Sequence, residues 1–198
     1  MCRQDIGDNI GGGSTADSTF LLHEALAQGL DGLLLTLKDP EAVAACVSAG
    51  VGASLTLDVG GKTDGLHGAP VRLTGVVCGL SDGQWEDRSP THGGGRFYTA
   101  GQCARFEAEG VTVVLTEKQS SNTSRGQFYQ IGVQPEECRI LVAKGVQSPR
   151  PAYQPIASHV LMANTPGITS ADLSSFQFEK RRVPLFPLDS GAEFRPRL

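Results

Sequence analysis

Apolar side chains in residues 14–30 recur near a 3.6-residue spacing, which predicts an amphipathic helix. Ser14 is the expected N-cap, and the Asp17 carboxylate three residues later would face the free amides at the helix start. Gly29 is the expected stop. We expect neither a strand nor a helix before the glycine-rich loop that precedes this segment.

The next segments predict a strand, a helix and a second strand. Residues 33–37 form an apolar run that is too short for a helix and predicts a buried strand. Asp39-Pro40-Glu41 predicts a helix start, with proline in the first turn and acidic side chains near the positive helix end; Gly50 ends this helix. Residues 54–59 alternate between apolar and polar, which predicts a half-buried strand.

From residue 71 onward, short β-type segments separated by turns predominate. We expect strands at 71–80, 84–87, 96–98, 103–107, 111–116 and 139–144. Short helices are expected at 126–131 and 153–162. These elements predict a single domain of the α/β or α+β class, in which a mixed β-sheet with an antiparallel β segment is flanked by helices. We expect the domain to span residues 1–189 and residues 190–198 to form a flexible tail.

Charge and composition exclude several classes of function. The chain has 17 Lys and Arg against 21 Asp and Glu, a formal net charge of -4, and so lacks the basic excess of a nucleic-acid-binding protein. No stretch approaches the roughly 20 apolar residues of a membrane-spanning helix. We therefore expect neither nucleic acid nor membrane as a partner. The five cysteines are widely spaced without a C-x-x-C pair, and no signal-peptide segment follows Met1, so we expect reduced thiols and a cytoplasmic location.

A glycine-rich loop, Asp8-Asn9-Ile10-Gly11-Gly12-Gly13-Ser14, leads into the first expected helix. Unpaired N–H groups and the helix dipole favour an anion at such a place. The loop either contacts a substrate or a metal-bound group, or forms a tight connection in which Asp8 and Asn9 only cap amides. It is not a dinucleotide fingerprint, because the G-x-G-x-x-G spacing is absent.

A second polar loop contains Lys62, Asp64 and His67. These side chains either bind an anion or lie near a metal, or they form a solvated turn. Gly61-Lys62-Thr63 does not complete a phosphate-binding P-loop, because the glycine required five residues earlier is Thr56.

Lys144 and Arg150 follow an expected strand, at the position where α/β proteins place ligand-binding groups. They either contact a carboxylate or belong to a solvated turn. The four histidines lie on separate elements, at positions 23, 67, 92 and 159, and Ala27 excludes the H-E-x-x-H zinc motif. We therefore expect no metal site and no cofactor in this chain.

Taken in order, several segments resemble the C-terminal domain of the microcystinase C (MlrC) family, whose members are regarded as zinc metallopeptidases. The matching segments span roughly residues 5–189: Asp5-Ile6-Gly7-Asp8-Asn9-Ile10-Gly11-Gly12-Gly13-Ser14 with Asp17, Asp39-Pro40-Glu41-Ala42-Val43, Gly60-Gly61-Lys62-Thr63, Leu80-Ser81-Asp82-Gly83, Lys144 with Arg150-Pro151-Ala152-Tyr153 and Pro155-Ile156-Ala157, and Thr165-Pro166-Gly167-Ile168-Thr169 with Asp172-Leu173. The D-x-G-D-N-x-G-G-G opening is the most distinctive.

The resemblance implies that this chain is one part of a larger enzyme. Full members resemble two-domain proteins whose N-terminal domain holds the zinc. The chain is therefore expected to be a fragment or one half of a split enzyme, inactive alone, with that domain as partner and a peptide or small amide as substrate. Together with the loops above, the candidate cleft residues are Asp5, Asp8, Asn9, Gly11, Gly12, Gly13, Lys62, His67, Lys144 and Arg150. The alternative is a free-standing domain that binds small anions or another protein.

Overall fold

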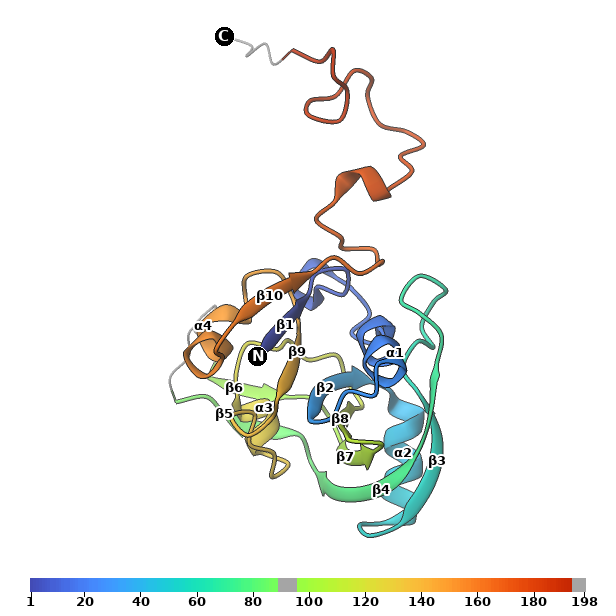
Figure 1. Ribbon diagram of the computed structural model, residues 1–198, viewed down its shortest axis with the longest axis vertical. Coiled ribbons are helices and arrows are strands. Elements are labelled where there is room, and N and C mark those ends of the chain that lie inside the picture. The colour runs from blue at the N-terminus through green and yellow to red at the C-terminus, as the bar shows by residue number, and fades with distance from the viewer. Residues whose placement is uncertain (89–95, 194–198) are drawn as a thin grey trace.

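A computed structural model describes residues 1–88 and 96–193. An eight-stranded mixed sheet with helices on both faces forms the body, and a long C-terminal segment leads away from it (Figure 1). His92 and the second glycine run, 93–95, lie outside the described residues, as do residues 194–198.

The sheet has the strand order β10-β1-β9-β2-β8-β7-β4-β3. Its strands are β1 (Cys2–Asp5), β2 (Leu33–Lys38), β3 (Ser54–Val59), β4 (Val71–Ser81), β7 (Cys103–Ala108), β8 (Val111–Thr116), β9 (Ile140–Lys144) and β10 (Val160–Ala163). The strands from β10 to β8 pair in parallel, whereas β7, β4 and β3 add antiparallel pairs. A second, antiparallel sheet joins β5 (Gln84–Glu86) to β6 (Phe97–Thr99). The predicted mixed sheet with an antiparallel segment is confirmed.

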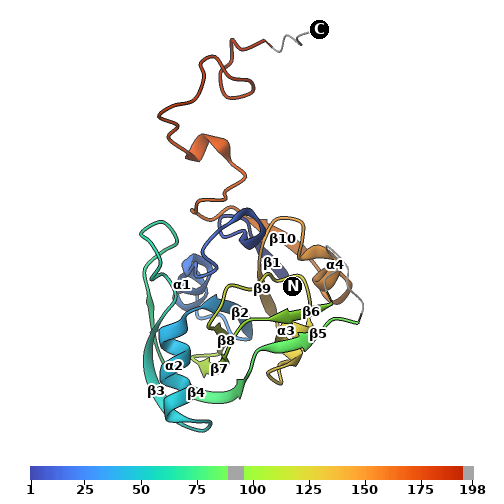
Figure 2. The same cartoon turned by 180° about the vertical axis from the view of Figure 1, so that it is seen from behind.

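Helices cover both faces of the sheet (Figures 1 and 2). α1 (Phe20–Ala27) and α2 (Pro40–Ala49) lie on one face, where they pack with Leu35, Phe106 and other strand residues into the larger hydrophobic core. α3 (Gly126–Tyr129) and α4 (Arg150–Tyr153) lie on the other, where Phe128 and Tyr153 pack against Leu34 and Leu141. Short 3-10 helices span Ile10–Gly12, Gln154–Ile156 and Leu173–Ser175. The α2 prediction is confirmed: the Asp39 carboxylate accepts from the Ala42 N–H at the helix start.

The predicted start of the first helix at Ser14 is wrong. α1 begins at Phe20, and its N-cap, Thr19, makes no side-chain capping bond. Residue Ala16 has φ of 67°, a left-handed conformation that interrupts any helix through it. Ser14 and Asp17 bond to groups far away in the sequence instead of capping α1.

β1 and β10, the two strands at one edge of the sheet, were also missed by the reasoning from sequence. β1 precedes the glycine-rich loop and pairs with both β9 and β10. Residues 153–162 do not form one helix: a 3-10 turn that includes Pro155 follows α4, and β10 begins at Val160. Proline has no N–H for a helical hydrogen bond, while the neighbouring β1 offers a parallel partner for the chain that follows.

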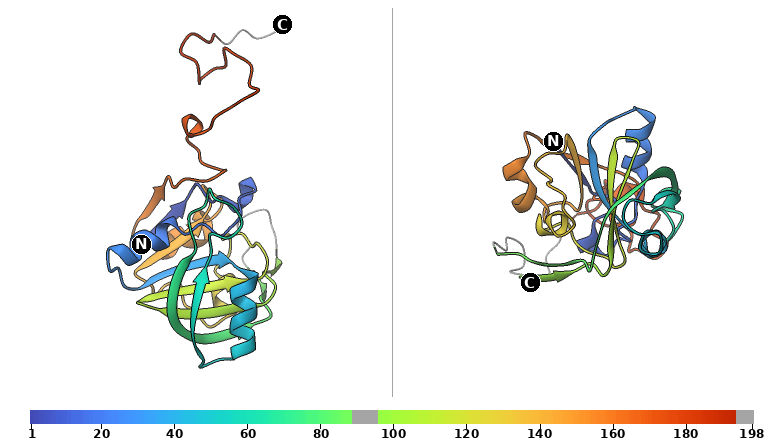
Figure 3. Two further views of the ribbon diagram at one scale, coloured as in Figure 1. Left: turned by 90° about the vertical axis from the view of Figure 1, so that its right-hand side faces the viewer. Right: turned by 90° about the horizontal axis from the view of Figure 1, so that it is seen from below.

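Beyond residues 164–170, which bond to the loop after β1, the chain leads away from the body, as Figure 3 shows from two further directions. It carries exposed apolar side chains, among them Val183 at 69% and Phe186 at 67% relative exposure. We call residues 177–193 the C-terminal arm. Among the residues that the structure describes, no helix has the length and hydropathy of a membrane span.

Candidate functional site

The carboxyl ends of the parallel strands meet along one edge of the sheet, where α/β proteins commonly bind ligands. Asp5 ends β1 and Lys144 ends β9, and the two residues are paired in register. Three loops meet at this edge: residues 6–19 after β1, residues 60–70 after β3, and residues 164–170 after β10. The site is therefore assembled from segments that are up to 162 residues apart in the sequence.

A fully buried ion pair lies at the centre of this edge. The Lys144 Nζ is 2.8 Å from Asp8 Oδ2, and both side chains have 0% relative exposure. The carboxylate also accepts from the Ser14 hydroxyl at 2.6 Å and from the N–H groups of Ala16 and Ser18, both at 2.8 Å. Burial alone would raise the pKa of Asp8, but the Lys144 charge and these hydrogen bonds outweigh it and lower the pKa to about 2.

Asp5 is a second carboxylate near the Lys144 ammonium. Its Oδ1 accepts from the Asp8 N–H at 3.3 Å and from the Thr165 hydroxyl. Its Oδ2 is buried and has no hydrogen-bond partner in the part of the chain that the structure describes; it lies 3.7 Å from the Lys144 Nζ. Asp5 therefore supports the loop through one oxygen and presents the other toward the ammonium.

A hydrogen-bonded chain links this ion pair to the second loop. The Ser14 Oγ is 2.9 Å from His67 Nε2, and His67 Nδ1 is 2.9 Å from each oxygen of Asp64. His67 is fully buried and Ser14 is 1% exposed, whereas the Asp64 side chain is 28% exposed. We call Asp64, His67, Ser14 and Asp8 the relay.

Ser14, His67 and Asp64 have the contacts of a nucleophile, a base and an orienting acid. Two observations argue against a nucleophilic Ser14. Its hydroxyl is closer to the Asp8 carboxylate, at 2.6 Å, than to the His67 ring, at 2.9 Å, and the side chain is buried. A carboxylate accepts the hydroxyl proton more strongly than a neutral ring nitrogen, so the proton is directed to Asp8.

Residues 165–169 seal the buried groups from solvent. Thr169 donates its hydroxyl to the Gly7 carbonyl at 2.8 Å and accepts from the Asn9 N–H at 2.8 Å. A Cβ on Gly7 would lie 2.1 Å from the Thr165 carbonyl oxygen, and one on Gly167 would lie 2.1 Å from the Gly7 oxygen. Glycine is therefore required on both sides of this contact.

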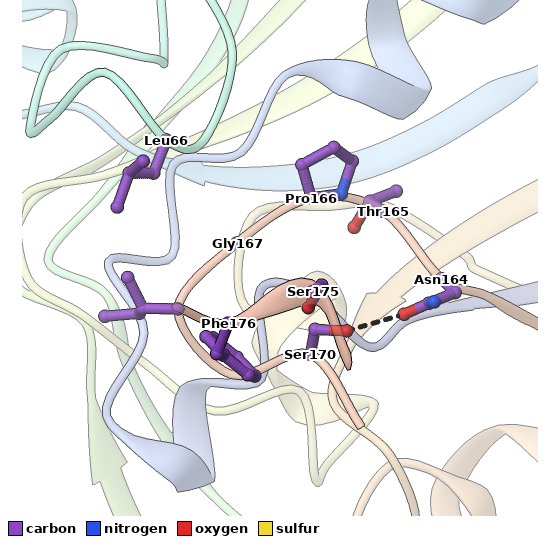
Figure 4. A pocket seen from close by; sticks show the side chains of 9 residues that line it. Leu66, Asn164, Thr165, Pro166, Gly167, Ser170, Ser175 and Phe176 are labelled. Atoms are coloured by element: carbon purple, nitrogen blue, oxygen red, sulfur yellow. Dashed lines mark hydrogen bonds between the residues drawn. The ribbon is translucent and has the colours of Figure 1, made fainter. Parts of the chain in front are cut away.

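A cavity of about 360 Å³ lies outside this seal, between the second loop and the start of the C-terminal segment (Figure 4). Leu66, Pro166, Ile168 and Phe176 supply most of its apolar lining. A hydrogen bond of 2.9 Å between the Ser170 hydroxyl and the Asn164 side chain closes one wall. The cavity adjoins the site without reaching the buried ion pair.

The glycine-rich loop forms the exposed rim of the same edge. Gly11, Gly12 and Gly13 are exposed and follow the partly buried Asn9. A Cβ on Gly11 would meet only Asn9 Oδ1, at 3.5 Å. The structure thus brings together, at one edge of the sheet, the predicted residues Asp5, Asp8, His67 and Lys144 and the predicted glycine-rich loop.

Lys62 and Arg150, which were also candidates, have other partners. The Lys62 Nζ lies 3.0 Å from Asp39 and 3.2 Å from Glu41, and the Lys62 N–H donates to Asp17 Oδ2 at 3.0 Å. The Lys62 side chain therefore links the second loop to the start of α2 through ion pairs. Arg150 begins α4 on the opposite face of the sheet, where its guanidinium donates to Gln147 at 3.4 Å.

The roles of Ser14 and Thr165 were missed by the reasoning from sequence. Both partners of Ser14 lie outside the helix that it was expected to cap. Thr165 bonds Asp5 across 160 residues, a contact that no local pattern reveals. The only sequence signal was the presence of both residues in motifs of the resembling family.

The described residues do not fit a zinc ion. They contain no cluster of three or more His, Cys, Asp or Glu side chains that could hold a metal. Both nitrogens of His67 are already engaged, and Asp8 accepts four hydrogen bonds, including one from an ammonium. Burial raises the pKa of Cys2, Cys46 and Cys103 to about 11, which disfavours the thiolate that zinc requires.

Comparison with known proteins agrees with the site's motifs. A family profile described as MlrC C-terminus matches residues 4–180. Microcystinase C of a Sphingomonas sp is 25% identical over 187 residues, which are 93% of this chain and 35% of that protein. A crystal structure from Mesorhizobium sp. BNC1, of a protein provisionally named a metallopeptidase, has a TM-score of 0.82 and 26% identity, covering 95% of this chain and 37% of that one. This chain thus spans little more than a third of either relative's length. It belongs to the MlrC C-terminus family.

Proposed function

We propose that this chain forms one wall of the substrate cleft in a metal-dependent amide hydrolase whose metal ligands lie in an N-terminal domain. The observation that carries this proposal is the convergence of Asp5, Asp8, His67 and Lys144 beneath an exposed glycine loop at the strand ends. The family membership and the relatives' greater length support it.

In this proposal, the buried groups hold the rim in place. The Asp8–Lys144 pair and the backbone bonds to Asp8 fix the course of residues 14–18, and Thr169 holds Asn9. The exposed backbone of Gly11 to Gly13 then offers a surface without side chains to a peptide or small amide, while the Gly12 and Gly13 N–H groups keep the loop folded by donating to the Asn9 and Ile10 carbonyls. A zinc ion in the other domain would supply the activated water. The chain alone would therefore bind without hydrolysing.

We also infer a reducing location such as the cytoplasm. All five cysteines are free, and three of them are buried in the two cores. Proteins of oxidising compartments more commonly pair their cysteines.

The proposal is tested in full-length microcystinase C in which this chain replaces the matching region. We expect this chimera to cleave the relative's own substrate. Gly11→Trp should lower kcat/KM about tenfold or more by filling the cleft, since a small misplacement of substrate has effects of this size. Gly11 accepts a side chain without a backbone clash, so the fold should remain intact.

The matched control is Ser48→Trp, at an exposed position near the C-terminal end of α2. This substitution should leave kcat/KM unchanged. Zinc content and the unfolding midpoint should be equal in both variants. Equal kcat/KM for Gly11→Trp and the parent chimera would contradict a cleft at the glycine loop. A folded, zinc-loaded but inactive chimera would contradict the proposed role of the chain as a whole.

A further inference from the structure

The relay contains one hydroxyl proton and two acceptors for it. The Ser14 Oγ lies 2.6 Å from Asp8 Oδ1 and 2.9 Å from His67 Nε2. A serine hydroxyl donates one hydrogen bond and accepts others, so it cannot donate to both groups at once. The direction of the Ser14 hydroxyl therefore decides what His67 Nε2 must do.

The state of the two flanking carboxylates restricts the choice further. Asp8 is ionised at neutral pH, because its pKa is lowered to about 2. Burial would raise the pKa of Asp64, but the Leu66 N–H and the His67 ring outweigh burial and hold it below its usual range. An ionised carboxylate only accepts, so His67 Nδ1 carries a proton toward Asp64 in either arrangement.

Two arrangements remain. In both, Ser14 donates to the ionised Asp8 carboxylate, the stronger acceptor. In the first, the ring is a doubly protonated cation and Nε2 donates to the Ser14 oxygen. In the second, the ring is neutral and the single lone pair of Nε2 faces the Ile168 N–H. Moving between them requires one proton on Nε2.

The seal responds to the same nitrogen. The Ile168 N–H points at His67 Nε2 from 3.5 Å, a long contact that is favourable only when Nε2 has a free lone pair. A proton on Nε2 would oppose this N–H. The neutral ring therefore holds residues 165–169 over the site, whereas the cationic ring releases Ile168 and strengthens the bonds to Asp8.

We propose that His67 is a positioning residue whose protonation decides whether Nε2 donates to the Ser14 hydroxyl, and so strengthens the Ser14–Asp8 bond, or accepts from the Ile168 N–H and holds residues 165–169. His67 thereby couples the buried ion pair to the wall of the cavity lined by Leu66, Ile168 and Phe176. The proton state of His67 is a property of this chain alone and does not depend on the proposed cleft.

The charged groups around His67 come from each element packed near it. Its own loop supplies Asp64, the loop after β1 supplies Asp8 through Ser14, and Lys144 at the end of β9 lies behind Asp8, with Asp5 beside it. Residues 165–169 contribute no charged side chain. The Lys144 ammonium already donates to Asp8, and His67 acts on that carboxylate through the Ser14 hydroxyl.

The test is an NMR titration of the full chain labelled with ¹³C and ¹⁵N. The ring nitrogens of His67, the carboxyl carbon of Asp8 and the amide of Ile168 are followed from pH 5 to pH 9. We expect all three signals to move with one shared midpoint, with both His67 nitrogens protonated on the acid side. An Asp8 carboxyl signal that stays constant while His67 titrates would overturn the proposal. So would an Nε2 that never gains a proton.

Two variants separate the relay from a general change in structure. In Ser14→Ala, His67 should still titrate while the Asp8 carboxyl signal no longer follows it. In His67→Gln, an amide can still donate to Ser14 but does not titrate, so the pH dependence at Asp8 and Ile168 should vanish. Ser174→Ala removes an exposed hydroxyl and should keep the shared midpoint. An Asp8 signal that follows His67 equally well in Ser14→Ala would show direct action through space and refute the relay.

Discussion

Asp8 and Asp189 have similarly low pKa values in very different surroundings. Burial would raise the pKa of Asp8, but the Lys144 charge and four hydrogen-bond donors outweigh this effect and lower the pKa to about 2. For Asp189, on the C-terminal arm, hydrogen bonds from Arg181 and the Leu185 N–H lower the pKa to about 2. The Arg181–Asp189 side chains are 26% and 25% exposed, whereas those of Lys144 and Asp8 are fully buried.

A lowered pKa shows that a carboxylate has partners that stabilise its charged form. It does not show how much the pair contributes to the free energy of folding. Water screens the arm pair and can replace each partner. In the site, removing one partner leaves the other charge in a place that water does not reach. The comparison predicts that equivalent substitutions act strongly at the site and weakly on the arm.

The largest effect is expected for Asp8→Asn. This change leaves the Lys144 ammonium buried without its 2.8 Å partner, and breaking such a buried pair typically lowers the free energy of unfolding by about 3–5 kcal/mol. Asp189→Asn should leave the unfolding midpoint of the body unchanged. Urea denaturation at pH 7, followed by the fluorescence of the single tryptophan, Trp85, measures both. Equal losses in the two variants would contradict the comparison.

Gly7→Ala tests the seal and ranks second. The added Cβ would meet the Thr165 carbonyl oxygen at 2.1 Å, so the backbone of residues 165–169 must move. We expect a loss of about 3 kcal/mol, at the upper end of the usual effect of overpacking, and faster amide exchange at Ile168. Gly191→Ala on the arm meets no atom within 4 Å and should change neither quantity. Protected exchange at Ile168 in Gly7→Ala would show that the seal does not depend on this contact.

Ser14→Ala is expected to have an intermediate effect on stability. It removes a 2.6 Å bond to the ionised Asp8 carboxylate, and a hydrogen bond to a charged group contributes about 2 kcal/mol when buried. Ser174→Ala also removes a hydroxyl that donates to a carboxylate, that of Asp172, but at an exposed place. Thermal unfolding should therefore separate the two variants by several degrees. An unchanged midpoint for Ser14→Ala would show that water replaces the hydroxyl.

The same contrast between local and distant contacts explains which parts of the fold the sequence could predict. β2 and β8 are short, mainly apolar runs, and α2 has its own capping residue and proline, so each is encoded within a few positions. β1 has the mixed sequence Cys-Arg-Gln-Asp and is a strand because β9 and β10 lie on either side of it. Its pairing is a tertiary effect that residue patterning does not contain.

The site divides in the same way. The polar loop residues Asp8, His67 and Lys144 could be singled out by residue type and by their positions beside strands or glycines. Their meeting could not, because it depends on parallel strand order and on loops that cross the sheet edge. Ser14 looked like a helix cap because serine before an apolar run usually is one. Here the Asp8 carboxylate and the His67 ring compete for its hydroxyl and hold it away from α1.

The most gradual effect is expected from acid. Because the folded-state pKa of Asp8 is lowered from 3.8 to about 2, its contribution is complete above about pH 4 and is lost as the pH falls toward 2. The shift corresponds to roughly 2 kcal/mol, spread over this whole interval. Urea midpoints reported by Trp85 should decline over this range in the parent chain and in Asp189→Asn alike, since the arm pair lies outside the body. Asp8→Asn should lack this part of the decline. If Asp189→Asn removed it instead, the arm would have to be coupled to the unfolding of the body, and the contrast between a fully buried and a partly exposed carboxylate would no longer explain the stability of this chain.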